Sequence, residues 1–107
     1  MLKGNFFDFD ADCALEAESF EDLVKGKGAR IERIVSRGQR APEGGGYFVQ
    51  DWDEWVLLLS GEAHVELAQE LVVLKSGDWL WIPASAAHRV VYTSSEPPCV
   101  WCAVHMD

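Results

Sequence analysis

Short apolar or alternating segments, separated by turn residues, run along most of the chain. Residues 29–35 alternate charged and apolar side chains for most of their length, and residues 55–59 are an uninterrupted apolar run. Further segments of this kind are residues 63–67, 71–74, 79–82, 88–92 and 99–104. Strands spaced by about ten residues, with turns between them, predict a β-sandwich or β-barrel. We find no long helical periodicity and no internal repeat.

The first 28 residues are a different kind of segment, rich in acidic and aromatic side chains. Within it, residues 19–24 begin with a serine followed by acidic residues, which suits the start of a short helical turn. Residues 26–28, Gly-Lys-Gly, predict a turn. We therefore divide the chain into an N-terminal arm, residues 1–28, and a barrel, residues 29–107. We expect the phenylalanines of the arm to pack on the barrel or on a second subunit.

Size and charge disfavour several classes of partner. The 107 residues suffice for one hydrophobic core and not for two. The net charge of −9 repels phosphate backbones and anionic lipids, so we expect neither nucleic-acid nor membrane binding. No segment approaches the roughly 20 apolar residues of a membrane span, and the first residues do not resemble a signal peptide. Three cysteines, an odd count, argue against a disulfide framework, and we expect a cytoplasmic protein.

Two glycine-containing segments carry a recognisable spacing. In the first, six residues separate Glu54 from Gly61; in the second, five residues separate Gly77 from Pro83, and His88 follows. These spacings resemble the two motifs of the cupin superfamily, G-x5-H-x-H-x3,4-E-x6-G and G-x5-P-x-G-x2-H-x3-N. The chain is most similar to small single-domain cupins of the cupin 2 type, in a subset that reads Q-x-x-D-E-W before a G-E turn. The resemblance implies an all-β fold, a double-stranded β-helix or jelly-roll barrel with a short N-terminal arm.

The resemblance, which covers residues 30–105 as a fold, also implies metal ligands. The family's glutamate and last histidine ligands correspond to Glu54 and His88. Two departures weaken the set: Phe48, which cannot bind metal, stands at the first histidine of the family motif, and Gln50 stands at the second. An amide oxygen is a weaker ligand than an imidazole.

Alternation along the strands directs three polar side chains toward one interior. Gln50 and Glu54 share parity, and His88, Val90 and Tyr92 likewise share one face of a strand. One amide oxygen, one carboxylate and one imidazole leave open positions for a substrate. We therefore predict a divalent metal ion, Fe, Mn, Ni, Zn or Cu, bound by Gln50, Glu54 and His88. The alternative is a buried hydrogen-bonded pair of Glu54 and His88.

Two further residues are candidates for acid–base catalysis. His105 can face the cavity as a base or fourth ligand, or it can be a hydrogen-bonded strand histidine. Tyr92, which stands where the second motif has its asparagine, is the other candidate. Cys99 and Cys102 form a C-x-x-C pattern inside a predicted strand, where their side chains point to opposite faces, so we interpret both as packing residues.

These residues together favour a small-molecule function. We predict a small metal-binding cupin that binds or acts on a small molecule, through metal-dependent isomerase, lyase or dioxygenase chemistry. One alternative is a non-catalytic binding or sensing module, and another is a purely structural barrel with a buried polar network. We also expect a homodimer, because a short barrel with exposed sheet edges and an aromatic arm has surface to cover.

Overall fold

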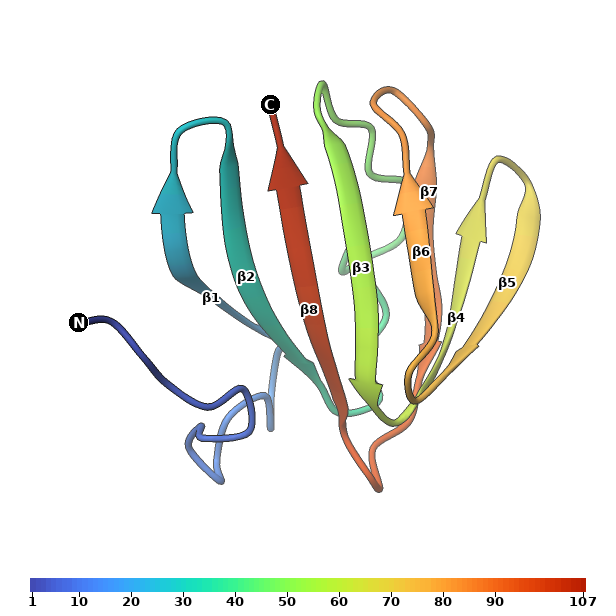
Figure 1. Ribbon diagram of the computed structural model, residues 1–107. Coiled ribbons are helices and arrows are strands. Elements are labelled where there is room, and N and C mark those ends of the chain that lie inside the picture. Colours follow the sequence, from blue (N-terminus) through green and yellow to red (C-terminus); the bar gives the residue numbers. More distant parts are fainter.

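The computed structural model describes residues 1–107 and consists of two antiparallel sheets. The strands are β1 (Ser19–Gly26), β2 (Ala29–Ser36), β3 (Asp53–Ser60), β4 (Glu62–Leu67), β5 (Glu70–Lys75), β6 (Trp79–Ile82), β7 (His88–Thr93) and β8 (Cys99–Met106). One sheet has the order β1-β2-β8-β3-β6 and the other β5-β4-β7. The three-stranded sheet lies behind the β3–β6 side of the larger one (Figure 1). The predicted all-β jelly roll is confirmed, and no helix is long and apolar enough to cross a membrane.

Residues 19–24 do not form the expected helical turn, because they lie in β1 at the edge of the five-stranded sheet. β1 pairs with β2 along its whole length, and two of its acidic residues form ion pairs with arginines of β2. Glu21 lies opposite Arg33 and forms an ion pair with it at 2.9 Å, while Asp22 binds Arg30 at 2.9 Å. Strand pairing and these cross-strand ion pairs outweigh the local preference of a Ser–acid sequence for a helix start.

The segment before β1 lies beside the lower ends of β1 and β2 (Figure 1). Arg33, which is buried, donates from Nη1 to the carbonyl oxygens of Asn5, Phe6 and Asp8 at 3.1 to 3.4 Å. Its guanidinium also lies 5.5 Å from the centre of the Phe9 ring. Arg37 and Gln39 donate in the same way to the carbonyl oxygens of Ala11, Cys13 and Ala14. Side-chain donors on and after β2 therefore hold the N-terminal segment on the sheet through its main-chain carbonyls.

The tight turn between β3 and β4 depends on a glycine. Gly61 has a φ of 94°, and a Cβ at this position would lie 2.8 Å from both Cys99 Sγ and Ser94 Oγ. Only glycine combines this backbone conformation with such a close approach. The turn brings β3 and β4, which belong to different sheets, against the same core.

The hydrophobic core fills the space between the two sheets. It consists of nine buried side chains: Val56, Leu58, Ala63, Val65, Leu74, Ile82, Cys99, Trp101 and Ala103. Val56, Val65, Ile82 and Trp101 also line the cavity described below. The core and the candidate site therefore share a wall, which holds the polar side chains of the site on rigid strands.

Candidate functional site in the barrel cavity

A cavity of about 380 Å³ lies between the sheets, within the size range of small-molecule sites. Eighteen residues line it, and 11 of them are hydrophobic. The remaining seven, contributed by four strands and the segments before β1 and β3, are Glu18, Arg30, Glu32, Gln50, Glu54, His88 and His105. The cavity thus combines an apolar lining with a small polar wall.

Glu54, on β3, is the centre of the polar wall. It is 7% exposed, and its Oε1 accepts a hydrogen bond from Nε2 of Gln50 at 2.7 Å. His105, on β8, is its direct cross-strand neighbour, with Nδ1 3.7 Å from the same oxygen. Oε2 of Glu54 has no partner within the protein, and no fully buried polar side-chain atom lacks one, so this oxygen is open to the cavity.

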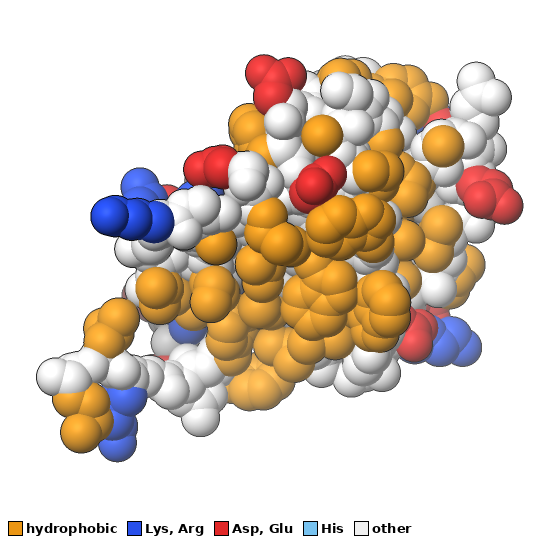
Figure 2. Space-filling view, turned by 45° about the horizontal axis from the view of Figure 1, so that its top comes forward, with side chains coloured by type: hydrophobic (Ala, Val, Ile, Leu, Met, Phe, Trp, Pro, Cys, Tyr) orange, Lys and Arg blue, Asp and Glu red, His pale blue; other side chains and the backbone are white.

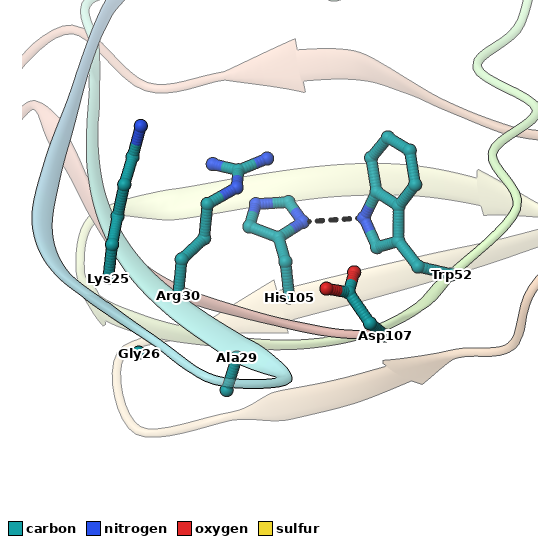
Figure 3. A pocket seen from close by; sticks show the side chains of 7 residues that line it. All are labelled: Lys25, Gly26, Ala29, Arg30, Trp52, His105 and Asp107. Carbon is teal, nitrogen blue, oxygen red and sulfur yellow. Dashed lines mark hydrogen bonds between the residues drawn. The ribbon is translucent and has the colours of Figure 1, made fainter.

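Both ring nitrogens of His105 have partners. Nδ1 lies 2.9 Å from the indole Nε1 of Trp52 (Figure 3), and Nε2 lies 2.9 Å from Oε1 of Glu32. Because an indole N–H can only donate, Nδ1 is the acceptor and the neutral ring carries its proton on Nε2, which donates to Glu32. His105 is therefore held in one tautomer between two carboxylates, Glu32 and Glu54.

His88, at the start of β7, has one free nitrogen. Its Nδ1 lies 2.9 Å from the carbonyl oxygen of Ala86, which can only accept, so Nδ1 carries the proton and Nε2 keeps a lone pair. The ring is 5% exposed and lies 5.5 Å from the ring of Phe48. His88 makes no hydrogen bond with Glu54, so the pair expected as a metal-free alternative does not form; Glu54 is bound to Gln50 instead.

Tyr92 lies away from this cavity, which corrects the expectation that it shares a face with His88 and Val90. Tyr92 is opposite His64 and Val90 is opposite Val65, so Val91 is an extra residue on β7. This β-bulge reverses the alternation beyond it and leaves Tyr92 44% exposed, with its ring centroid 4.7 Å from that of His64 and the two ring planes tilted by 41°. Gln50, Glu54, His88 and His105 all line the cavity; Tyr92 does not.

The predicted metal site contains fewer of the common metal-binding side chains than metal sites usually have. No group of three or more His, Cys, Asp or Glu side chains is arranged to hold a metal ion. Three atoms without protein partners nevertheless belong to residues of the same cavity: Oε1 of Gln50, Oε2 of Glu54 and Nε2 of His88. Their chemistry suits one divalent ion with water in the remaining positions, and Glu54 is the single charged ligand.

Three residues of the polar wall, Glu18, Arg30 and Glu32, were not anticipated as site residues from the sequence, and neither was Trp52, which binds His105. A signal for Glu32 exists, because Arg30, Glu32 and Ile34 share parity and all line the cavity. Trp52 precedes β3, where no strand periodicity applies. Burial raises the pKa of Glu18, the Glu32 charge adds to the rise, and the hydrogen bond from Ser36 opposes it.

The C-x-x-C pattern lies inside β8, as the sequence predicts, with Cys99 buried and Cys102 partly exposed. Burial raises the pKa of both thiols, which disfavours the reactive thiolate. Both cysteines are free. Their surroundings agree with a packing role rather than a redox site.

Comparison with known proteins agrees with this architecture. The profile of the Cupin domain family matches residues 40–105. A solved structure from Ralstonia eutropha JMP134, with the provisional name mannose-6-phosphate isomerase, is 42% identical, with 98% of this chain and 97% of that chain covered and a TM-score of 0.84. A cupin superfamily protein from Desulfitobacterium hafniense DCB-2 shares 16% identity over 85% of this chain and 78% of that chain, with a TM-score of 0.71. A protein from Thermus thermophilus, TT1209, shares 18% over 99% and 97%, with a TM-score of 0.75. None of the curated proteins matches the chain.

Proposed function

Because the chain belongs to the cupin family, we propose that it binds a small organic molecule in the barrel cavity and catalyses a proton transfer in it, as isomerases do. The observation that carries this proposal is the position of His105, held on the cavity wall with Glu32 at 2.9 Å on one side and Glu54 at 3.7 Å on the other. A carboxylate beside an oriented imidazole is an arrangement suited to general acid–base chemistry.

His105 is the proposed base. Its Nδ1, the ring nitrogen without a proton, accepts a proton from a carbon next to a substrate carbonyl and returns it to the neighbouring carbon. Glu54, with Oε1 at 3.7 Å from Nδ1, stabilises the positive charge that the ring carries in between. Glu32 balances the charge that His105 gains when it is protonated, and Trp52 releases Nδ1 at that moment.

A divalent metal ion is part of the proposal, with Gln50, Glu54 and His88 as its ligands. When bound, such an ion acts as a Lewis acid that polarises a substrate oxygen. Nδ1 of His88 is already anchored on Ala86, which orients its free Nε2 as metal-binding histidines require. The provisional name of the Ralstonia eutropha protein supports the isomerase class over lyase or dioxygenase chemistry.

The second candidate is a non-catalytic binding module. It is favoured by one observation: Glu54 and His105 are already held in hydrogen bonds within the protein, since Gln50 bonds Glu54 and both nitrogens of His105 have partners. A ligand could then fill the apolar part of the cavity without disturbing the network. Binding without any change in the ligand would be the result that selects this candidate.

Solvent exchange separates the two candidates directly. Protein loaded with Mn, Fe, Zn, Ni or Cu is incubated in deuterated water with free and phosphorylated aldoses and ketoses, and proton NMR follows the hydrogen next to the carbonyl. We expect wild-type protein to wash out that hydrogen and Glu54→Gln to be slower by about 100-fold or more. Ligand binding without exchange under any metal would contradict the catalytic proposal. Circular dichroism checks that the variant is folded.

A further inference from the structure

Arg40 is the one arginine of the chain that makes no hydrogen bond or ion pair within the protein. The other four bind carboxylates or main-chain carbonyl oxygens: Arg30, Arg33, Arg37 and Arg89. Arg40 is exposed and directly precedes Ala41, which forms an isolated bridge with Val90 of β7. In a chain with 18 acidic and 9 basic residues, this guanidinium is available to an anion from solution.

Arg40 lines a pocket of about 400 Å³ that contains two guanidinium groups and no carboxylate. Its other lining residues are Arg89, the glycines 44–46 and four apolar residues. The central cavity, in contrast, has three carboxyl groups in its lining, and so does the pocket on the other side of Arg40, which includes Glu16, Glu18 and Glu43. An anion therefore meets an excess of positive charge in the pocket between Arg40 and Arg89.

The pocket beside His105 also contains two cations, but their charge is already balanced. Nζ of Lys25 and Nη1 of Arg30 lie 3.3 and 2.9 Å from the two carboxylate oxygens of Asp22, and Asp107 lines the same pocket (Figure 3). It is thus a weaker candidate for an anion than the pocket with Arg40.

Arg89 is held in place from two sides. Its Nε and Nη2 donate to Oε2 of Glu66 at 3.2 and 3.0 Å, and its guanidinium lies 4.5 Å from the centre of the Tyr47 ring. The Tyr47 hydroxyl donates to Oε1 of the same carboxylate at 2.6 Å. Glu66 offsets the charge of Arg89 but leaves its Nη1 without a partner. Arg40 therefore supplies the net charge of the pocket, and Arg89 supplies an oriented N–H donor.

Two main-chain amides of the glycine loop also lack acceptors. Gly45 donates to the carbonyl oxygen of Pro42 at 3.1 Å, whereas Gly44 and Gly46 donate to no protein atom. A Cβ added at any of the three glycines would meet nothing within 4 Å, so no side chain obstructs an approach to this loop. Successive free amides in a loop with positive φ values are a common way to bind an anion.

The pocket and the central cavity meet at one main-chain bridge. Ala41 and Val90 line both spaces and exchange two hydrogen bonds, of 3.0 and 2.7 Å. The proposed metal ligands, Gln50, Glu54 and His88, line the cavity and not the pocket. An anion bound beside Arg40 therefore needs no contact with the metal ion.

We propose that this pocket binds a phosphate group, either as inorganic phosphate or as the monoester of a small molecule. Arg40 supplies the charge, and Nη1 of Arg89 and the amides of Gly44 and Gly46 supply further donors. A phosphate monoester carries three strong acceptor oxygens, whereas a carboxylate carries two, so it matches donors that come from both sides of the pocket. The bound group joins the loop before β3 to β7 across the Ala41–Val90 bridge.

A titration followed by proton–nitrogen NMR tests the site at single residues. Inorganic phosphate and phenyl phosphate are added separately to nitrogen-15-labelled protein, as purified, at about pH 7 and constant ionic strength. We expect saturable shifts of the Gly44 and Gly46 amide signals and of the Arg89 side-chain signal. Sodium acetate is the reference anion and should bind more weakly by about tenfold or more.

Variants identify the residues responsible. Arg40→Gln should weaken phosphate binding by about tenfold, because a charge-assisted contact is lost. Arg89→Lys keeps the charge but not the planar guanidinium, and should weaken binding by about threefold. Lys27→Gln removes one positive charge from an exposed turn and should leave binding unchanged. His88→Ala removes a proposed metal ligand and should also bind phosphate as the wild type does.

The outcomes are distinct. The phosphate site would be overturned if the Gly44 and Gly46 signals did not shift saturably, if Arg40→Gln bound phosphate as the wild type does, or if acetate bound equally well. Loss of binding in His88→Ala would place the phosphate on the metal ion, which would also overturn the site. Binding of inorganic phosphate alone supports the site with free phosphate as its ligand, and binding of phenyl phosphate supports it with a phosphorylated molecule. The proposed function in the cavity stands or falls separately.

Discussion

Trp52 donates its indole N–H to Nδ1 of His105 at 2.9 Å, and this bond fixes the proton of the histidine on Nε2. The two residues are 53 positions apart in the sequence and come from the segment before β3 and from β8. Their rings meet edge to face, with centroids 6.1 Å apart. The tautomer of the proposed acid–base group is therefore set by a residue outside the strands.

Removal of the indole donor should release His105. In Trp52→Phe, Nδ1 loses its partner, so we expect nitrogen-15 NMR to show the His105 ring as a mixture of tautomers instead of the Nε2–H form alone. The lost hydrogen bond and packing should lower the free energy of unfolding by about 1–2 kcal/mol. Trp79→Phe, at a position 61% exposed on β6, is the matched control and should leave His105 unchanged. A single Nε2–H tautomer in Trp52→Phe would contradict this role.

Metal binding should depend on His88 and not on His64. Elemental analysis of protein purified without chelator should find a divalent metal in wild type, and His88→Ala should lose about tenfold or more of the affinity. His64 pairs with Glu62 at 3.1 Å and does not line the cavity, so His64→Ala is the control and should retain the metal. Equal metal content in wild type and His88→Ala would sink the proposed ligand set.

The fold could be predicted from the sequence because the relevant signals are local. Alternation in segments such as residues 63–67, and turns such as that at Gly61, mark each strand independently, and these strands are present in the structure. The interior position of Glu54 follows from the same alternation, because its strand is regular from Asp53 to Leu58. Local patterns were sufficient to predict a side chain's position wherever the strand contained no β-bulge and the side chain did not depend on a partner far away in the sequence.

The rest of the site depends on a β-bulge and on contacts between residues far apart in the chain, which hydrophobic alternation and turn residues do not reveal. Val91 is an extra residue on β7 with no glycine or proline to mark it, so the reversal that turns Tyr92 outward is invisible in the sequence. The partners of His105 depend on tertiary approach: Trp52 is 53 positions away and Glu32 is 73. The helical turn expected at residues 19–24 failed because pairing with β2 outweighed a local capping preference.

The raised pKa of Glu18 predicts a pH-dependent contribution to stability. Burial is the main cause, so the folded state holds the proton more tightly than the unfolded state does. The contribution is present below the unfolded pKa of about 4.3 and is lost as pH rises through the folded value. Glu18→Gln, which can still accept from Ser36, should therefore have a higher melting temperature than wild type at about pH 8, and this advantage should disappear near pH 4. Glu70→Gln should show no such pH dependence, and a pH-independent difference for Glu18→Gln would contradict the prediction.

Alanine substitutions at two glycines with the same backbone conformation distinguish the cost of backbone strain from the cost of a steric clash. Gly61 and Gly77 both have a φ of 94°, but an added Cβ would meet Cys99 Sγ and Ser94 Oγ at 2.8 Å at Gly61 and nothing within 4 Å at Gly77. Gly77→Ala should cost only the backbone term, about 1–2 kcal/mol. Gly61→Ala should cost about 1–3 kcal/mol more, because the β3–β4 turn must move away from β8. Equal midpoints for the two variants in urea would show that the turn has room to relax.

We propose that two copies of the chain pair through the outer face of the five-stranded sheet. Trp79 and Trp81, at 61% and 43% exposed, lie on that face beside Trp55, and Figure 2 shows a broad gathering of hydrophobic side chains with few charged ones among them. Burying these rings must overcome the repulsion between two chains of net charge −9, so the dimer should tighten as salt screens that repulsion. Light scattering should give a dimer mass for wild type and a monomer mass for Trp79→Lys. Leu71→Lys, equally exposed on the edge of the other sheet, should remain dimeric. A monomeric wild type at high salt, or dissociation caused by Leu71→Lys alone, would place the interface elsewhere or remove it.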